Sequence, residues 1–558
     1  MKSLYLIAGG FLLWLNATSY AQNEPDWSAP VPENGRVNPY NLDVETFQMA
    51  RNQGQIHAQI YPVSVTGALP PYKPIESILG SKDTHVFRRW LNQIFKSLVG
   101  LHNLNDVLEL LGLHDYPKEN DVGVYKVAYP NNKRPDYKIG FGIVEKGSAQ
   151  GFTFSCATCH SGNLFGKTVL GLTNRFVRAN EFFAVGKLAI AHVPPPIFRF
   201  YTGATAEETE MFNVLQRNLK GITAKKPLAI GLDTSLAQVS LSLNRRNSDE
   251  IASKNSQYEK NPRPDLLDNF PADSKPAVWW NVKYKNRWLS DGSVVSGNPI
   301  FTNILWNEIG RGADLELLEK WLSENPKTIQ ELVTAVFSAQ APRITDFFSE
   351  NQIDVGSAKA GQTIFREMCM RCHGDYVKRW EQPGFENLSI REQIETVSVR
   401  YKPTTVAVDV GTDPNRYLGM RSLEKLNDLR ISKNNRILIQ FQKGYVPPPL
   451  VGIWARWPYL HNNSIPNLCA LLTRADERPK HFFQGAAVNS KTDFDFDCNG
   501  YPVGEKTPPS WRTRAMSYSA DREGMHNFGH DEGIFLRDGQ ELLTMRQKRE
   551  LIFYLQTL

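Results

Sequence analysis

Two five-residue stretches of this sequence, 156–160 and 369–373, contain the residue types that attach a metal cofactor. Each has the pattern C-x-x-C-H. In c-type haem attachment, two thiols bond the vinyl groups of one porphyrin, and the histidine that follows becomes the proximal ligand of the iron. The sequence therefore predicts two covalently bound c-type haems. The attachment residues would be Cys156, Cys159, Cys369 and Cys372, and the proximal iron ligands would be His160 and His373.

Cysteine pairs of this spacing also occur in zinc sites and in thioredoxin-like dithiols. A zinc site built from both pairs would join ligands that are far apart in the chain and would leave the two trailing histidines without a role. A redox dithiol would not need the histidines either. The haem interpretation accounts for every residue of the pattern, and it is the one adopted here.

The first 21 residues have the pattern of a secretory signal peptide. Lys2 supplies a positive charge, residues 4–15 form an unbroken apolar stretch, and small residues precede a cleavage site between Ala21 and Gln22. An apolar stretch of this length is too short to span a hydrocarbon layer of about 30 Å. We therefore expect a periplasmic or secreted protein with no stable membrane insertion after cleavage.

Composition and charge exclude some other classes of protein. Hydrophobic residues make up 41% and charged residues 22% of the chain, as in ordinary globular proteins. The net charge is +6, and no cluster of Lys and Arg is dense enough to predict a nucleic-acid partner. Two cysteines, Cys469 and Cys498, lie outside the two frames. In an oxidising compartment they are expected to form a disulfide, with two separate buried thiols as the alternative.

The expected fold class is mainly α with little β: two cytochrome c-like haem domains with long loops, and an N-terminal haem-free extension. The signal peptide would occupy 1–21, the extension 22–150, the first haem domain 151–345 and the second 346–558. Within the extension, apolar residues recur at helical spacing over 86–98. The first haem is expected on a loop, because the Gly-rich stretch before it has no helical pattern.

The second frame is expected to lie between two helices. Apolar residues over 360–368 fall on one helical face, after a capping residue at Ser357, and lead directly into the frame. Near the end of the chain, Thr544 and Gln547 form a capping box ahead of a helix with one apolar stripe. Helices on both sides of a haem attachment frame are typical of cytochrome c.

Residues 447–468 read PPPLVGIWARWPYLHNNSIPNL. This signature segment resembles one found in the bacterial di-haem cytochrome c peroxidase superfamily. Within that superfamily, the sequence GMHNFGH at 524–530, VWW at 278–280 and the pair Asp291-Gly292 resemble the branch that contains the rubber oxygenases. The resemblance covers about residues 150–558.

The resemblance also implies a set of iron ligands. His530 would be the distal ligand of the second haem, so that His373 and His530 hold its iron from opposite sides. His526 and Met525, which lie close by in the sequence, remain alternatives. His461, within the signature segment, is expected to anchor a polar turn through its imidazole and not to bind iron. A calcium ion is a further candidate cofactor.

The family resemblance implies one haem with an open coordination position and one six-coordinate electron-transfer haem. The haem of His160 has no recognisable distal motif; His192 is the nearest candidate, but a single histidine in an apolar stretch is more often packed in a core. The expected function is an extracytoplasmic oxidoreductase whose open haem reacts with peroxide or dioxygen. Its partner would be an electron donor or acceptor protein or a small redox substrate. No catalytic residue is assigned. The alternatives are a non-catalytic electron-transfer di-haem cytochrome and a haem-bearing binding or sensor protein.

Overall fold

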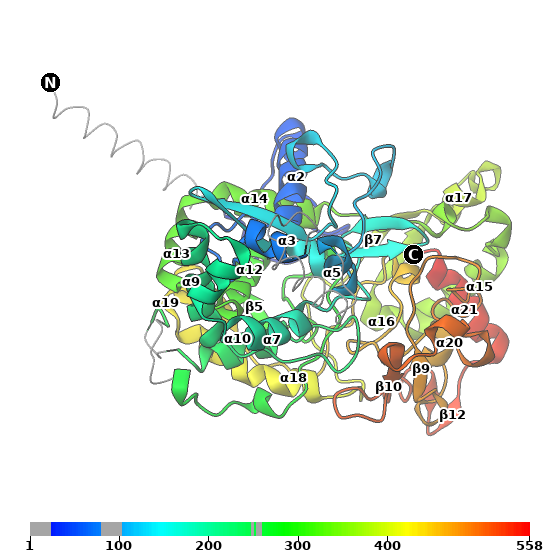
Figure 1. Cartoon of the computed structure of the whole chain (residues 1–558). Helices are drawn as coiled ribbons and strands as arrows, with labels where there is room; N and C mark the ends of the chain where they lie inside the picture. Colours follow the sequence, from blue (N-terminus) through cyan, green and yellow to red (C-terminus); the bar gives the residue numbers. More distant parts are fainter. Residues whose placement is uncertain (1–23, 80–102, 247–249, 253–258) are drawn as a thin grey trace.

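The computed structural model describes residues 24–79, 103–246, 250–252 and 259–558 (Figure 1). Helix accounts for 42% and strand for 11%, so the fold is mixed, with only small sheets, where the sequence predicted a mainly α protein. The described strands pair in antiparallel sheets of two strands each. The signal peptide expected at 1–21 and the helix expected at 86–98 lie outside the described residues.

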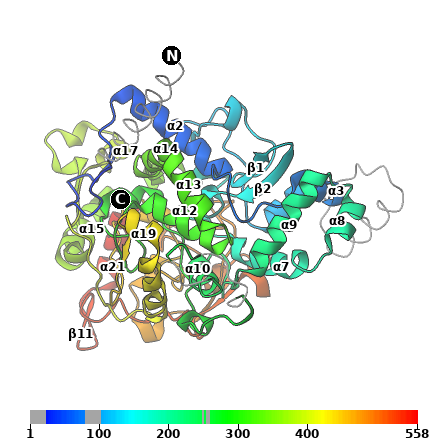
Figure 2. The ribbon, with the colours of Figure 1, turned by 90° about the vertical axis from the view of Figure 1, so that its left-hand side faces the viewer.

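The N-terminal part of the described chain packs against its middle. Helix α2 (Val44–Ile60) lies along α14 (Pro326–Phe337) (Figure 2). The two helices are so close that a Cβ atom on Gly54 would lie 1.9 Å from the carbonyl oxygen of Glu331. Residues before the first C-x-x-C-H frame therefore share an apolar core with residues that come well after it.

The first C-x-x-C-H frame lies between two β-hairpins. Strands β1 (Phe141–Lys146) and β2 (Ala149–Phe154) form one hairpin, and β3 (Ser161–Leu164) and β4 (Lys167–Leu170) form the other. Between the hairpins, α6 (Cys156–Cys159) is a single helical turn. The Gly-rich stretch before the frame is not helical, as predicted. Its residues pair as β1 and β2, with Gly147 (φ +63°) in the turn between them, and the frame itself forms the single turn α6 in place of the expected loop.

The helices between the two frames are interrupted where prolines occur. Helix α7 (Ala179–Ile190) ends before Pro194, and α8 (Pro195–Thr202) begins with prolines, whose missing N–H groups are not needed in a first turn. The helices that follow are α9 (Ala206–Lys220), α10 (Ser235–Leu243), α12 (Pro299–Gly310) and α13 (Leu315–Glu324). Helices α10 and α12 pack against each other.

The second frame follows α15 (Val355–Met368) and forms the single turn α16 (Met370–His373). The helix predicted before the frame is confirmed, but Ser357 is not its cap. Asp354 accepts hydrogen bonds from the backbone N–H of Ser357 at 2.9 Å and from its hydroxyl at 2.7 Å. The helix therefore begins earlier than predicted, and Ser357 supports the cap that Asp354 supplies.

The terminal helix α21 (Met545–Gln556) begins with a capping box of Thr544 and Gln547, as predicted. It packs against α15. A Cβ atom on Gly361 of α15 would lie 2.0 Å from the carbonyl oxygen of Glu550, so this approach of the two backbones requires glycine. The helix before the second frame and the terminal helix thus contact each other directly.

The remaining helices and strands are short. The helices are α3 (Tyr72–Leu79), α5 (Leu104–Leu110), α17 (Ile390–Gln393), α18 (Asn415–Gly419), α19 (Arg430–Asn434) and α20 (Leu468–Leu471). The strands are β5 (Val294–Ser296), which pairs with β8 (Leu438–Ile439); β6 (Asp375–Lys378) with β7 (Thr396–Arg400); β9 (His481–Phe483) with β10 (Ser517–Ser519); and β11 (Leu536–Arg537) with β12 (Gln540–Glu541).

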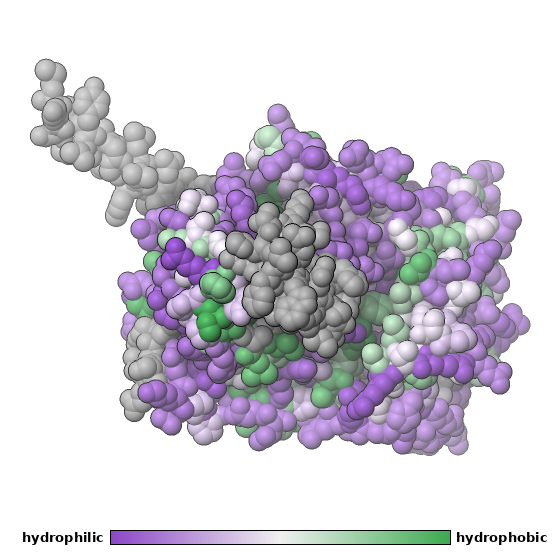
Figure 3. All heavy atoms as spheres, viewed as in Figure 1, coloured by the Kyte–Doolittle hydropathy of each residue, from purple (hydrophilic) through white to green (hydrophobic). Residues whose placement is uncertain are grey.

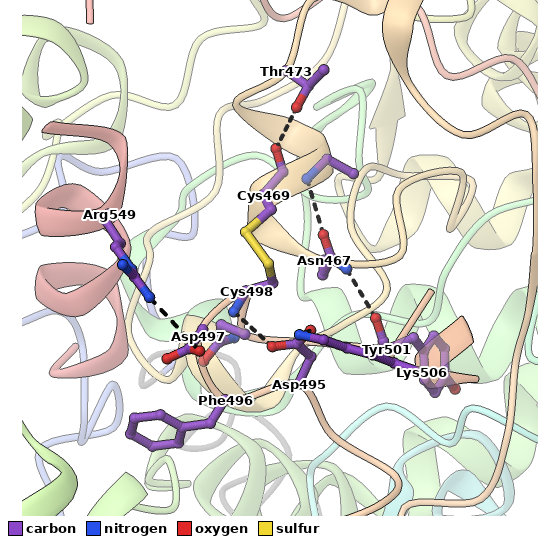
Figure 4. The surroundings of a disulfide bond; sticks show 12 residues. Asn467, Cys469, Thr473, Asp495, Phe496, Asp497, Cys498, Tyr501, Lys506 and Arg549 are labelled. Carbon is purple, nitrogen blue, oxygen red and sulfur yellow. Dashed lines mark hydrogen bonds and ion pairs between the residues drawn. A yellow bond between two sulfur atoms is a disulfide. The ribbon is translucent and has the colours of Figure 1, made fainter. Parts of the chain in front are cut away.

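The predicted disulfide is confirmed. Cys469 in α20 is bonded to Cys498, with 29 residues of sequence separation and 4.9 Å between the α-carbons (Figure 4). Asp495 accepts a hydrogen bond from the backbone N–H of Cys498 at 3.2 Å. The bond therefore closes a loop whose end is also held by a carboxylate.

The largest apolar cluster crosses the boundary predicted between the two haem domains. It combines Leu164 and Trp280 from one side with Phe365 and Trp454 from the other. The division of the chain into an extension and two haem domains stays a prediction.

Candidate haem-binding sites

A backbone carbonyl holds the imidazole of His160 in the first frame. The Nδ1 atom of His160 lies 2.8 Å from the carbonyl oxygen of Ala277. Because a carbonyl only accepts, Nδ1 donates the proton and Nε2 keeps its lone pair. Burial lowers the pKa of His160 to about 4, so the ring is neutral at neutral pH. A neutral imidazole fixed through Nδ1 is the form that binds a metal.

A cavity of about 260 Å³ opens beside His160. Its wall includes Cys156 and Cys159 of the same frame, residues of α7, α10 and α12, and the segments 274–277 and 288–290. The two thiols and the imidazole thus face one cavity, as attachment to a single porphyrin requires.

The described lining of this cavity offers no second imidazole and no thioether. His160 is its sole histidine, and it contains no methionine. His192, the distal candidate from the sequence, is not part of the lining. It is exposed, and its Nδ1 lies 3.3 Å from the carbonyl oxygen of Leu188, one turn earlier in the chain.

Two other side chains of the lining that have metal-binding atoms are engaged elsewhere. The hydroxyl of Tyr61 donates to Glu308 at 2.5 Å. The Nζ of Lys275 donates to the carbonyl oxygen of Arg456 at 2.7 Å and also to that of Pro458. Both side chains therefore already have hydrogen-bond partners within the protein.

The wall contains polar atoms that suit a bound haem. Ser155 Oγ, Trp306 Nε1 and two guanidinium nitrogens of Arg416 are buried in it without a hydrogen-bond partner. Buried polar atoms without partners are uncommon and mark places where a polar ligand belongs. Phe154 and Val239 supply apolar surface to the same wall. A haem has a broad apolar ring and two propionates, so the residues present fit it.

The proximal histidine of the second frame is held in the same way. The Nδ1 of His373 lies 2.8 Å from the carbonyl oxygen of Pro448, in the signature segment. Burial lowers the pKa of His373 to about 4. The hydroxyl of Tyr376 donates to the carbonyl oxygen of His373 at 2.9 Å, which fixes the backbone as well as the ring. Both frames therefore present an oriented, neutral imidazole.

The structure brings His530 to face His373. The centroids of the two rings are 6.2 Å apart, and their planes are inclined by 53°. An imidazole nitrogen binds a metal at about 2 Å and lies about 1 Å from its ring centre, so two rings on opposite sides of one ion are about 6 Å apart. The separation of His373 and His530 matches this value.

Backbone contacts determine the position of His530. Its N–H donates to the carbonyl oxygen of Val410 at 2.8 Å, and its φ is +57°. A Cβ atom on the preceding Gly529 would lie 2.3 Å from the carbonyl carbon of Gly411. Burial lowers the pKa of His530 to about 4, and His373 adds to the effect. Nδ1 of His530 has no hydrogen-bond partner.

The two alternatives to His530 make other contacts. The Nδ1 of His526 lies 2.9 Å from the carbonyl oxygen of Ala520, and its ring stacks on Phe528. Met525 is fully buried, with its sulfur 3.8 Å from the hydroxyl of Tyr518. Of the three residues, His530 is the one with a ring contact to His373.

The signature segment 447–468 connects the surroundings of the two proximal histidines. Pro448 holds His373, as described above, and the indole N–H of Trp280 donates to the carbonyl oxygen of Val451 at 2.9 Å. Trp280 follows Ala277, the partner of His160, by three residues. The two histidines are thus linked through two short, hydrogen-bonded segments.

His461 does not anchor a turn through its imidazole, in contrast to the expectation from the sequence. The ring stacks on Tyr445 with 3.9 Å between centroids, and its Nε2 has no hydrogen-bond partner. Its backbone carbonyl instead accepts from the N–H of Lys275 at 2.7 Å. Burial lowers the pKa of His461 to about 3, so the stacked ring is neutral.

The geometry disfavours the two alternative uses of the cysteines. Burial raises the pKa of Cys156 to about 11 and that of Cys369 to about 12, whereas a redox dithiol needs a lowered thiol pKa. In the part of the chain that the structure describes, no three His, Cys, Asp or Glu side chains are grouped to hold a metal ion. The expected calcium ion therefore has no support in the described residues.

None of the described helices is long and apolar enough to cross a membrane.

Residues 444–483 match the protein family described as "RoxA-like, cytochrome c-like". The matched stretch includes the whole signature segment and Cys469. The match relates the chain to the rubber-oxygenase-like cytochromes and indicates a c-type cytochrome oxidoreductase with covalently bound haem iron.

Two proteins of Sinorhizobium fredii are also similar to this chain. The protein y4iJ is 23% identical over 478 residues, which cover 72% of this chain and 76% of the relative. The protein y4iM is 24% identical over 304 residues, which cover 53% of this chain and 64% of the relative. Both are described as uncharacterized, so they supply no activity.

Sequence reasoning missed three features of these sites. The carbonyls of Ala277 and Pro448 orient the two proximal histidines, yet a backbone acceptor has no residue-type signal. Arg416 lines the first cavity although it lies within the predicted second haem domain. No local pattern distinguishes it from a surface arginine.

Proposed function

We propose that this chain is an extracytoplasmic di-haem c-type cytochrome that acts as an oxidoreductase. His160 would hold an open haem, and His373 with His530 would hold a bis-His electron-transfer haem. The observation that carries the proposal is the difference between the two proximal histidines. His530 faces His373 at 6.2 Å, whereas the described lining of the cavity at His160 has no second histidine and no methionine. A six-coordinate haem transfers electrons, and a haem with a vacant position supplies a site for peroxide or dioxygen.

The residues of the chain would fix and shield the open haem. Cys156 and Cys159 would hold it through thioether bonds. The hydrogen bond from Nδ1 of His160 to the carbonyl oxygen of Ala277 leaves Nε2 available to bind the iron. Helices α10 and α12 form part of the cavity wall. Orientation of a neutral axial imidazole by a second hydrogen bond also tunes the electron donation of that ligand.

An apolar organic substrate is the first to test. Phe154 and Phe183 line both the cavity at His160 and a neighbouring pocket between α7 and α9. Helices α7 and α8 also expose large apolar side chains, including Leu188 (73% exposed) and Ile197 (47% exposed). Figure 3 shows hydrophobic residues gathered near the position of α7 on an otherwise largely hydrophilic face. Dioxygen with an unsaturated hydrocarbon is therefore the first pair to assay, and hydrogen peroxide the second.

The proposal includes a location and a partner. A cleavable signal peptide at residues 1–21 would carry the protein to the periplasm or the medium, where c-type haem is attached and where the disulfide between Cys469 and Cys498 is stable. The bis-His haem would exchange electrons with a donor or acceptor protein or with a small redox substrate.

A haem count with carbon monoxide binding tests the proposal. A pyridine haemochrome assay on the purified protein should give two haems per chain. The double variant Cys156→Ala with Cys159→Ala should retain one haem and lose carbon monoxide binding to the reduced protein. The matched variant Cys369→Ala with Cys372→Ala should also retain one haem but keep carbon monoxide binding. One haem in the wild type would refute the proposal. Two haems that both fail to bind carbon monoxide would establish the non-catalytic electron carrier instead.

A further inference from the structure

A buried arginine in the wall of the first cavity has unused hydrogen-bond donors. Arg416, the second residue of α18, is 2% exposed and lines the cavity of His160. Its Nε and Nη1 have no hydrogen-bond partner. Arg311 in the same wall is different, because it donates to the carbonyl oxygen of Phe154 at 2.7 Å and lies 3.4 Å from the carboxylate of Glu308. The cavity thus contains one arginine engaged by the protein and one that is not.

Two carboxylates that interact electrostatically with Arg416 form no ion pair with it. Asp291 is buried and Asp233 is partly buried; burial raises the pKa of each carboxyl, and the charge of Arg416 lowers it. Among the described residues, neither forms an ion pair with Arg416 within 4.0 Å. Two donors of Arg416 are therefore left without a partner in a residue that lines the cavity.

We propose that Arg416 binds a propionate of the haem attached at Cys156 and Cys159. This inference rests on the proposed function, because it needs that haem. A guanidinium forms strong, charge-assisted hydrogen bonds with carboxylates. Covalent attachment beside His160 brings two carboxylates into this cavity together with the porphyrin. Arg416 is therefore a positioning residue: it would hold the cofactor by a carboxylate, in addition to the thioether bonds, and would set the charge near its iron.

The test compares three variants of the holoprotein. Arg416→Gln removes the charge, and Arg416→Lys keeps the charge but alters the donor geometry. Arg421→Gln is the matched control, since Arg421 lies five residues later and is exposed. Each haem is titrated by spectroelectrochemistry, and resonance Raman spectra record the propionate bending band. The pyridine haemochrome count is made on every sample, so that failure of the two-haem proposal is recognised separately.

Loss of the buried positive charge stabilises the oxidised iron. In Arg416→Gln the equilibrium constant for reduction of the open haem should therefore fall at least tenfold. This lowers its midpoint potential by at least about 59 mV for one electron. The propionate band should shift, while the bis-His haem and the Arg421→Gln control keep wild-type values. Arg416→Lys should show the band shift with a smaller change of potential.

Two results would overturn the assignment. One is an unchanged midpoint and an unchanged propionate band in both Arg416 variants, with two haems present. The other is evidence that Arg416 binds a carboxylate from solution and not a haem propionate. If calorimetry shows octanoate binding to the wild type but not to Arg416→Gln, and the propionate band is the same in both, Arg416 binds a free carboxylate and not the haem.

Discussion

The imidazole rings of His373 and His530 face each other across 6.2 Å, although one belongs to a helical turn and the other to a loop near the end of the chain. The contact depends on backbone interactions of the loop. The N–H of His530 donates to Val410, and Gly529 lies against Gly411. The protein chain itself thus holds the two imidazole rings close together.

Replacing His530 by Ala should convert the second haem from low spin to largely high spin. Both haems should remain attached, because thioether bonds do not depend on the distal ligand. The midpoint of that haem should rise, since an imidazole that donates to ferric iron is lost, while the midpoint of the other haem stays within error. Electron paramagnetic resonance and spectroelectrochemistry check these outcomes.

The matched control for His530→Ala is His526→Ala. His526 donates to Ala520 and stacks on Phe528, so its removal should leave the low-spin signal intact. Loss of that signal in His526→Ala, with retention in His530→Ala, would reverse the assignment of the ligand.

Replacing Gly529 by Ala should displace His530 without altering any ligand. The φ of Gly529 is +73°, and the added Cβ atom would lie 2.3 Å from the carbonyl carbon of Gly411. We expect a high-spin fraction in the second haem and a loss of stability of about 2 to 4 kcal/mol, of which backbone strain accounts for about 1 to 2 kcal/mol. Spin state and denaturant unfolding are the measurements.

Gly533→Ala separates backbone strain from this displacement. Gly533 has nearly the same φ, +74°, but its Cβ position has no neighbour within 4 Å. This control should lose only the strain of about 1 to 2 kcal/mol and keep the wild-type spin state. Equal spectra for both glycine variants would show that the contact with Gly411 does not position His530.

Replacing Gly361 by Ala should separate α15 from α21. The new Cβ atom would lie 2.0 Å from the carbonyl oxygen of Glu550, so the helices must move apart, at a cost of about 2 to 3 kcal/mol in the free energy of unfolding. Gly356→Ala, in the first turn of the same helix, has its nearest contact at 3.4 Å and should be neutral or stabilising by up to about 1 kcal/mol. Chemical denaturation of both variants tests the difference.

Replacing Cys469 and Cys498 by Ser should lower the free energy of unfolding by about 3 to 4 kcal/mol, because the bond closes a loop of 29 residues in the unfolded chain. Haem content should not change. Peptide mapping without reductant checks the bond in the wild type, and two free thiols there would contradict this prediction.

The sequence predicted local elements better than the framework around them. The C-x-x-C-H pattern is local, and so are the capping box of Thr544 and Gln547 and the helix that precedes Cys369. These elements were predicted because neighbouring residues determine them. The first frame is expected on a loop, whereas it forms a single helical turn between two hairpins, because short strands have weak local signals.

Long-range contacts account for the rest. The pairing of His530 with His373 was suggested by family resemblance and not by spacing, since only tertiary folding unites the two. Arg416 and the carbonyl of Ala277 gave no signal at all. A residue's role in a cavity wall depends on which elements pack around it, and backbone acceptors are the same for every residue type.

One short segment, residues 410–416, contacts both candidate haem sites. Val410 holds the backbone of His530, and six residues later Arg416 lines the cavity of His160. A change at one site that moves this segment would therefore also change the position of residues at the other site. Thermodynamic linkage makes such an effect reciprocal: if filling the cavity at His160 strengthens binding of iron by His530, then ligation by His530 strengthens binding in the cavity by the same free energy. Only changes that move this segment would couple the two sites; side-chain replacements that leave it in place would affect one site alone.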